Sequence, residues 1–140
     1  MVMSIYSEAI KKAKRVYVCG NGGSASTANH FVNDLVKMCG IKAYSLCANE
    51  ALLTAIANDE GYRTIFTEQL RIYAEPGDLV ITISTSGKSN NIIETHEYCK
   101  GLGLNYIAFP VYGGKTQIAE DMHLALAHSI CRELVEWAIA

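Results

Sequence analysis

Residues 16–35 of this 140-residue chain read VYVCGNGGSASTANHFVNDL. They begin with a short apolar run of the kind that is buried as a strand in a parallel sheet. Three glycines follow, and they allow backbone conformations in which amide groups can approach a ligand closely. Ser24 is a candidate N-cap for a helix over residues 25–37, and the start of such a helix favours a phosphate or a carboxylate. Two interpretations stay open for the turn, an anion site or a tight turn without a ligand.

Strands and helices alternate along the rest of the chain. Short apolar runs at residues 43–47, 79–83 and 106–109 predict three further strands. Helices are expected over residues 7–15, 51–58, 62–73, 90–100 and 117–137. This alternation predicts an α/β fold, a three-layer, doubly wound parallel sheet flanked by helices and of flavodoxin-like type, in one domain over residues 1–140. Ligands bind such a sheet beyond the carboxyl ends of its strands.

Composition excludes several classes of protein. Half of the residues are hydrophobic, 19% are charged and the formal net charge is -2, which argues against a polybasic surface for nucleic acid. No apolar run is long enough to span a membrane, and the N-terminus lacks the apolar core of a signal peptide. The five cysteines contain no C-x-x-C pair, so reduced and mostly buried thiols are expected. We therefore expect a cytoplasmic protein that binds neither nucleic acid nor membrane.

A second polar loop, STSGKS at residues 84–89, joins an expected strand to an expected helix. Four hydroxyl residues and a glycine at such a place suit an anion where the chain supplies few cations. The loop is not a Walker A motif, because G-x-x-x-x-G-K-[ST] does not occur. Both polar loops fall at the carboxyl end of the expected sheet, which favours one anion-binding site there.

Histidines and carboxylates recur in two of the expected helices. His30 and Asp34 are four residues apart, so they share a helix face and could act together on one substrate or metal. A plain surface pair is the alternative. His128 lies in the apolar last helix, about 20° around the axis from Asp121 and about 80° from Glu120, so either acid could lie near it. A structural core histidine is the alternative for His128.

Four blocks of the sequence together resemble a known family. They read GNGGSASTANHFVNDL, LLTAIANDEGYRTIFTEQL, GDLVITISTSGKSNNI and EDMHLALAHSICRELVE. In this order they are similar to the sugar isomerase (SIS) domain, specifically to the phosphoheptose isomerases, and they cover most of the chain. The resemblance implies an aldose–ketose isomerase that converts sedoheptulose 7-phosphate to D-glycero-D-manno-heptose 7-phosphate. The reaction proceeds through an enediol and needs an acid and a base at C1 and C2.

The resemblance also implies roles for individual residues. The family's general base falls on Asp34, where the family has glutamate, and its acid/base histidine falls on His128. The shorter carboxylate displaces the reactive oxygens by about one methylene, a change that can cost orders of magnitude in rate. The implied phosphate- and sugar-binding residues are Asn21, Gly22, Gly23, Ser24, Asn58, Asp59, Ser84, Thr85, Ser86, Ser89 and Glu120.

Some members of the family hold zinc, and the resemblance implies a candidate Zn²⁺ site here. The ligand positions are occupied by His30, Asp34, Glu120 and His128, with Glu120 in place of the family's glutamine. Imidazole nitrogen and carboxylate oxygen are both acceptable ligands of Zn²⁺. The additional negative charge should favour a divalent cation.

The chain departs from the family in length. The family's fifth strand is missing, because residues 113–115 lead directly into Thr116, and the chain is also short near residues 38–40 and at the N-terminal helix. Either flexible segments are left out of the sequence or the chain has lost them. The family assembles as a homotetramer with active sites at subunit interfaces, so a homo-oligomer is expected.

Two other functions remain open. The residues at positions 34 and 120 are compatible with a non-catalytic SIS module that binds a phosphosugar or a partner protein. An isomerase of another phosphosugar is also compatible with the motifs. The retained His128 favours an enzyme.

Overall fold

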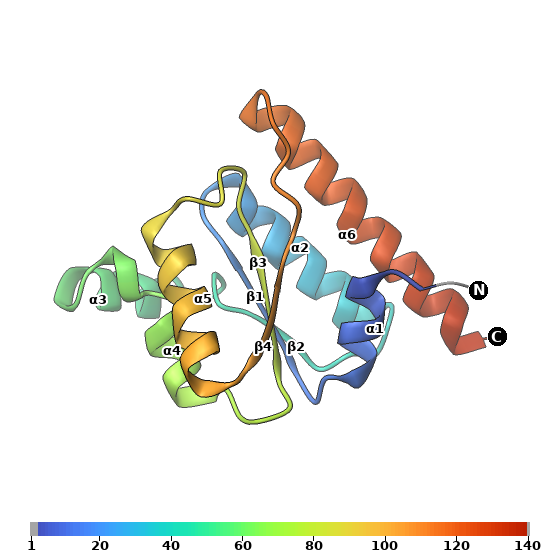
Figure 1. Ribbon diagram of the computed structural model, residues 1–140, viewed down its shortest axis with the longest axis horizontal. Helices are drawn as coiled ribbons and strands as arrows, with labels where there is room; N and C mark the ends of the chain where they lie inside the picture. The colour runs from blue at the N-terminus through green and yellow to red at the C-terminus, as the bar shows by residue number, and fades with distance from the viewer. Residues whose placement is uncertain (1–2, 140) are drawn as a thin grey trace.

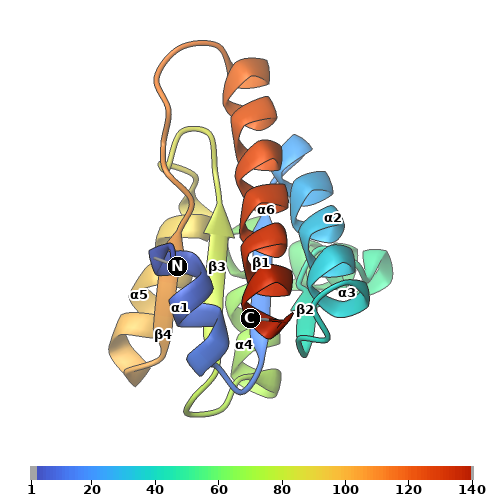
Figure 2. The same ribbon diagram turned by 90° about the vertical axis from the view of Figure 1, so that its right-hand side faces the viewer.

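The structure is a computed structural model that describes residues 3–139, and a parallel sheet lies at its centre (Figures 1 and 2). Its strands, in the order β2-β1-β3-β4, are β1 (Val16–Gly20), β2 (Ala43–Ser45), β3 (Leu79–Ile83) and β4 (Asn105–Ala108). The helices are α1 (Ile5–Lys12), α2 (Gly23–Lys37), α3 (Glu50–Asp59), α4 (Thr67–Tyr73), α5 (Asn90–Leu102) and α6 (Thr116–Ile139). A 3-10 helix, η1 (Tyr62–Thr64), precedes α4. The predicted doubly wound parallel sheet is confirmed.

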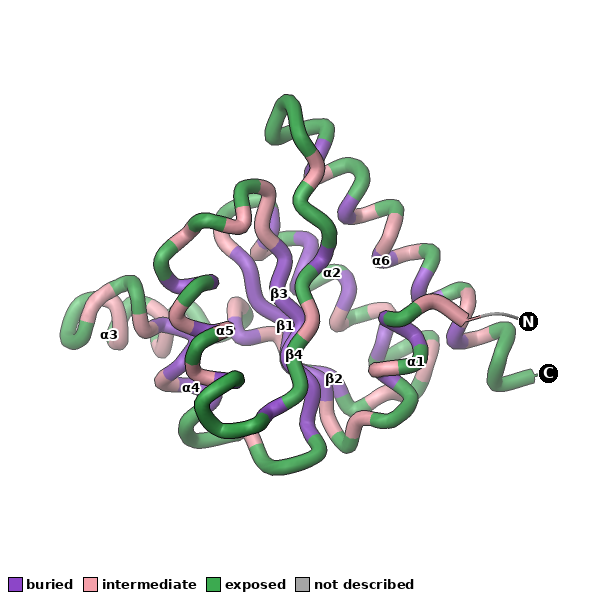
Figure 3. The backbone as a smooth tube through the Cα atoms, viewed as in Figure 1, coloured by how far each residue is buried: buried purple, intermediate pink, exposed green. Residues whose placement is uncertain are grey.

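The sheet separates two apolar layers. All residues of β1 and β3 are buried (Figure 3). Successive side chains of a strand point to opposite faces of the sheet. Val16 and Val18 pack with buried residues of α1, α2 and α6 on one face. Tyr17 and Cys19 pack with buried residues of α4 and α5 on the other face. The two central strands therefore pack against helices on both faces of the sheet. This packing positions the loops that follow the two strands.

Two local predictions are wrong. The helix expected over residues 62–73 is divided into η1 and α4, and the division lets the consecutive residues Ile65 and Phe66 both enter the core, where they are 3% and 1% exposed. Ser24 does not cap α2. Gly22 is the N-cap, with a φ of 55°, so the helix begins before Ser24, which is buried in its first turn.

The connection from β4 to α6 consists of residues 109–115 and rises above the sheet (Figure 2). Within residues 3–139 no strand follows β4, so β4 forms an edge of the sheet. Phe109 is buried, and His123 of α6 donates from Nε2 to the Pro110 carbonyl oxygen over 2.6 Å. Tyr6 of α1 donates to the Ala108 carbonyl oxygen over 3.0 Å. These contacts position the start of α6 without a fifth strand.

All five cysteines are free, and three of them, Cys19, Cys99 and Cys131, are buried. Burial raises the pKa of the Cys99 thiol to about 11. This thiol is therefore protonated at neutral pH. The expectation of mostly buried thiols is confirmed.

His96 of α5 gives the fold a dependence on pH. Its Nε2 lies 2.8 Å from Thr82 Oγ1 in β3, its ring stacks on Tyr106 of β4, and burial lowers its pKa below the usual 6.5. The unfolded chain then binds the proton more readily, so the free energy of unfolding falls as the pH decreases below about 6.5. We expect His96→Gln to reduce the difference between urea midpoints at about pH 7.5 and about pH 5.5. An unchanged difference would show that His96 does not contribute to it.

Candidate active site

The two polar loops predicted to bind an anion are neighbours. β1 and β3 are paired along their length, with Gly20 opposite Ile83 at their carboxyl ends. The first loop leads into α2 and the second into α5. The carboxyl ends of these strands therefore bring both loops to one edge of the sheet, as the sequence predicts.

Asn21 fixes the first loop to the opposite helix. Its side chain exchanges two hydrogen bonds of 2.8 Å with Asn91, which is 2% exposed at the start of α5. Tyr62 of η1 also donates to Asn21 Oδ1 over 3.0 Å. Neither Asn91 nor Tyr62 is among the site residues predicted from the sequence. Asn90 and Asn91 are adjacent and chemically identical, so only the direction of α5 shows which of them is buried.

The second loop is folded by its own hydroxyl groups. Ser84 Oγ accepts from the Gly87 amide over 2.9 Å, and Ser86 Oγ accepts from the Lys88 amide over 3.1 Å. Ser89 is the N-cap of α5, and its side chain makes no capping hydrogen bond. A hydroxyl that accepts one bond can still donate its proton, so the loop offers O–H donors beside the start of α5. This arrangement suits an anion.

Gly20, at the end of β1, is closely packed between the end of β3 and the first turn of α2. A Cβ at this position would lie 2.7 Å from the Ile83 carbonyl oxygen and 2.8 Å from Ser24 Cβ, so backbone would have to move. We expect Gly20→Ala to lower the free energy of unfolding by about 1–3 kcal/mol in urea denaturation. Gly101→Ala is the matched control, because a Cβ there meets nothing within 4 Å and should stabilise α5 slightly. Equal effects of both changes would contradict the crowding at Gly20.

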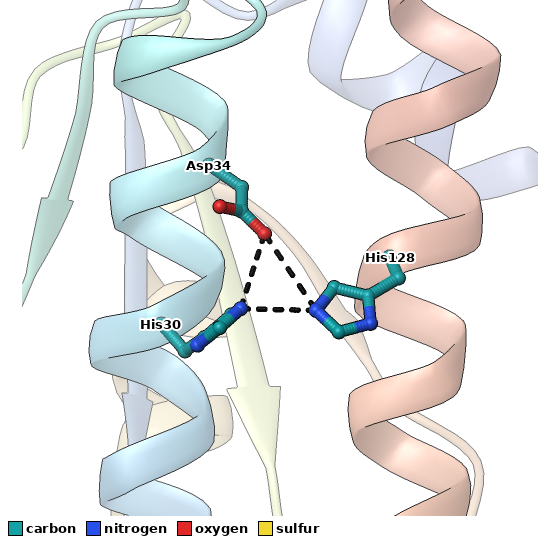
Figure 4. A group of neighbouring side chains, drawn as sticks. All are labelled: His30, Asp34 and His128. Carbon is teal, nitrogen blue, oxygen red and sulfur yellow. Dashed lines mark hydrogen bonds and ion pairs between the residues drawn. The ribbon is translucent and has the colours of Figure 1, made fainter.

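His30, Asp34 and His128 form one group between α2 and α6 (Figure 4). His30 Nε2 lies 2.9 Å from His128 Nε2 and 3.3 Å from Asp34 Oδ2. Asp34 Oδ2 lies 3.8 Å from His128 Nε2. The Asp34 side chain is 13% exposed, whereas those of His30 and His128 are 48% and 40% exposed. Three of the four predicted metal ligands, including both predicted acid/base groups, therefore each place one atom close to the others.

The group can move a proton or hold a cation. Two imidazole nitrogens that face each other cannot both carry a proton without repulsion, so one donates and the other accepts. The carboxylate oxygen beside them can accept a proton or stabilise an imidazolium. Two imidazole nitrogens and a carboxylate oxygen are also a ligand set that suits Zn²⁺. The chemistry of the donors therefore fits both roles.

The structure does not bring every predicted residue to this group. Glu120 lies about 12 Å along α6 from His128, and its carboxylate lies against Gly23 at the start of α2. Asn58 and Asp59 are exposed at the end of α3, where Asn58 donates to Asp59 over 2.9 Å. Of the two acids considered beside His128, neither belongs to the group; Asp34 of α2 lies there instead. The difference arises because α2 packs against α6, and this packing brings the carboxylate of Asp34 beside His128.

A hollow of about 400 Å³ lies between the first loop, η1 and the start of α5. The residues that line it are Asn21, Tyr62, Arg63, Ser89, Asn90 and Asn91. Two of the predicted substrate-binding residues, Asn21 and Ser89, thus share one cavity. Arg63 adds a cation that the sequence analysis did not identify.

Known proteins are similar to this chain in sequence and in fold. The SIS domain model matches residues 2–110. A phosphoheptose isomerase of Akkermansia muciniphila is 33% identical over 96% of this chain and 82% of its own length. A probable phosphoheptose isomerase of Thermoplasma acidophilum is 36% identical over 93% of this chain and 83% of its own length. The solved phosphoheptose isomerase of Neisseria gonorrhoeae superposes with a TM-score of 0.85 at 28% identity, covering 92% of this chain and 83% of that one.

Proposed function

The chain belongs to the SIS domain family, and from this membership and the site geometry we propose that it is a phosphoheptose isomerase. The proposed reaction is the aldose–ketose interconversion of sedoheptulose 7-phosphate and D-glycero-D-manno-heptose 7-phosphate. One observation carries the proposal: a carboxylate oxygen of Asp34 and an imidazole nitrogen of His128 lie 3.8 Å apart. At this separation, the two groups can act on adjacent atoms of one substrate.

The two groups have complementary roles in the proposed reaction. Asp34 removes a proton from C1 of the ketose, while His128 donates its Nε2 proton to the C2 carbonyl oxygen, and a 1,2-enediol results. The protonated Asp34 then returns a proton to C2. His128 takes the proton of the C1 hydroxyl, which leaves the aldehyde at C1 and restores both groups. His30 orients the imidazole of His128 before substrate binds, through the 2.9 Å contact between their Nε2 atoms, and the C2 oxygen then replaces His30 as the partner of that nitrogen.

We also propose Zn²⁺ as a cofactor that His30, Asp34 and His128 can hold. An imidazole nitrogen or carboxylate oxygen that ligates the metal cannot carry the transferred proton at the same time, so the metal-bound state and the acid/base state of the group are alternatives. When bound, the metal would act as a Lewis acid toward the substrate oxygens. Glu120 remains a proposed fourth ligand, and its carboxylate would have to leave Gly23 to reach the group. The remaining substrate contacts are proposed for the two polar loops, and for Asn58 and Asp59.

Zinc binding can be tested without turnover. We expect the metal-free protein to take up one Zn²⁺ per chain in calorimetry and His30→Gln to weaken that binding by at least about 10-fold, because one of three ligands is lost. His96→Gln is the control, since His96 bonds Thr82 and lies outside the group. Equal zinc affinity in the wild type and His30→Gln would exclude this site.

The assembly and location are proposed from the family resemblance. A homotetramer with active sites at its interfaces is supported by α3, which projects from the body and contains no buried residue (Figure 1). Asn58 and Asp59 at its end would then complete the site of a neighbouring subunit.

We place the enzyme in the cytoplasm. In the part of the chain that the structure describes, no helix is both long and apolar enough to cross a membrane.

The function is tested with a panel of heptose, hexose and pentose phosphates. Aldose formation from sedoheptulose 7-phosphate, with or without added zinc, is the expected result. No turnover of any member of the panel, together with tight binding, would instead support the non-catalytic module that the substitutions at Asp34 and Glu120 allow. Hydrogen exchange at C1 or C2 in heavy water would exclude that module. Preference for another phosphosugar would change the substrate but keep the chemistry.

A further inference from the structure

Arg63 stands beside the proposed phosphate loop without a role in the mechanism above. It belongs to η1 and lines the 400 Å³ hollow together with Ser89 and Asn90 from the start of α5. Among the six lining residues it has the only cationic side chain. The hollow thus places a guanidinium across from the helix start at which an anion is favoured.

A phosphate monoester needs more positive charge than the helix start and the hydroxyl groups of the loop provide. Such a group carries about -1.5 to -2 charges at neutral pH, whereas a helix start contributes only about half a positive charge. The hydroxyl groups of Ser84 and Ser86 are neutral and already accept bonds from Gly87 and Lys88. The chain itself has a formal net charge of -2. A complementary full charge is therefore expected from a nearby cation, and Arg63 lines the hollow whereas Lys88 of the loop does not.

Arg63 can supply this charge at small cost. In the structure its Nε lies 3.5 Å from Oε1 of Glu94, and the two side chains are 66% and 41% exposed. An exposed pair of this kind contributes little to stability, so the guanidinium can exchange Glu94 for another anion. The planar guanidinium can also donate two parallel hydrogen bonds to one phosphate.

We propose that Arg63 binds the phosphate group of the substrate, and that Glu94 holds the guanidinium beside the hollow when no phosphate is bound. The identity of the substrate rests on the proposed function, whereas the phosphate contact does not require turnover. Because the phosphate is remote from C1 and C2, Arg63 stabilises the bound substrate and the transition state equally. Its loss should therefore raise KM and leave kcat unchanged.

The test compares Arg63→Gln with the wild type in turnover and in binding of inorganic phosphate. We expect KM to rise about 10- to 100-fold, kcat to stay within about 2-fold, and phosphate affinity in calorimetry to fall by a factor similar to that for KM. Glu94→Gln should lower KM a few-fold, because a competing carboxylate is removed, and should have no effect in the Arg63→Gln background. Arg71→Gln is the control, since Arg71 forms a comparable exposed pair with Glu68 outside the hollow.

The outcomes separate this inference from the proposed function. If the protein isomerises no phosphosugar but Arg63→Gln still weakens phosphate binding, the phosphate contact stands and the proposed function fails. Normal KM and normal phosphate affinity in Arg63→Gln overturn the inference, even where turnover is robust. It is likewise overturned if Lys88→Gln reproduces the expected losses and Arg63→Gln does not, because the loop lysine then supplies the charge.

Discussion

Asp34→Asn is expected to lower kcat for sedoheptulose 7-phosphate by about 10²- to 10⁴-fold, with KM nearly unchanged. Asparagine keeps the size and the hydrogen-bonding oxygen of the side chain but cannot accept a proton from C1. The carboxylate oxygen of Asp34 lies 3.3 Å from His30 Nε2 and 3.8 Å from His128 Nε2, and no other carboxylate belongs to the cluster. Single-turnover and steady-state measurements of aldose formation would give both constants.

Asp34→Glu tests the position of the same carboxylate. It restores the family's residue and extends the side chain by one methylene, so it should keep most of the activity or exceed that of the wild type. Asp121→Asn provides a control at an exposed carboxylate of α6, outside the group. If Asp34→Asn kept wild-type kcat, Asp34 would not be the base and another acceptor would have to be sought.

His128→Gln is expected to have an effect of similar size, a loss of about 10²- to 10⁴-fold in kcat. Glutamine can donate a hydrogen bond to the C2 oxygen but cannot transfer a proton and take it back. The same change removes a proposed zinc ligand, so zinc affinity should fall as well. Rate measurements and zinc calorimetry on one preparation would report both losses.

Comparison with His30→Gln separates the two roles of His128. His30 is a proposed zinc ligand and a positioning residue but transfers no proton in the proposed reaction. A large loss of kcat in His128→Gln and a smaller one in His30→Gln would support acid/base catalysis by His128. Equal losses that zinc in excess restores in both variants would show that metal binding alone explains the effect of either change.

The fold was predictable because its central strands are almost entirely apolar. β1 and β3 are completely buried, and apart from Thr82 and Gly20 their residues form continuous hydrophobic runs. The break between η1 and α4 was not predictable, because Ile65 and Phe66 fit a single apolar helix face equally well. Only packing against the sheet shows that both must enter the core.

The candidate site was predictable where its residues lie close in sequence. The four-residue spacing of His30 and Asp34 implies a shared helix face, and the structure places both side chains there. His128 joins them only because α6 packs beside α2, a long-range contact that periodicity alone does not reveal. The direction of the Glu120 side chain and the cation in the hollow, Arg63, also depend on tertiary packing.

The reciprocal bonds between Asn21 and Asn91 have a mechanical consequence. Asn21 precedes Gly22, the N-cap of α2, which carries Asp34, and Asn91 lies in the first turn of α5, beside the proposed phosphate loop. The two hydrogen bonds therefore link the loop that we propose to bind the phosphate to the helix that carries the proposed base.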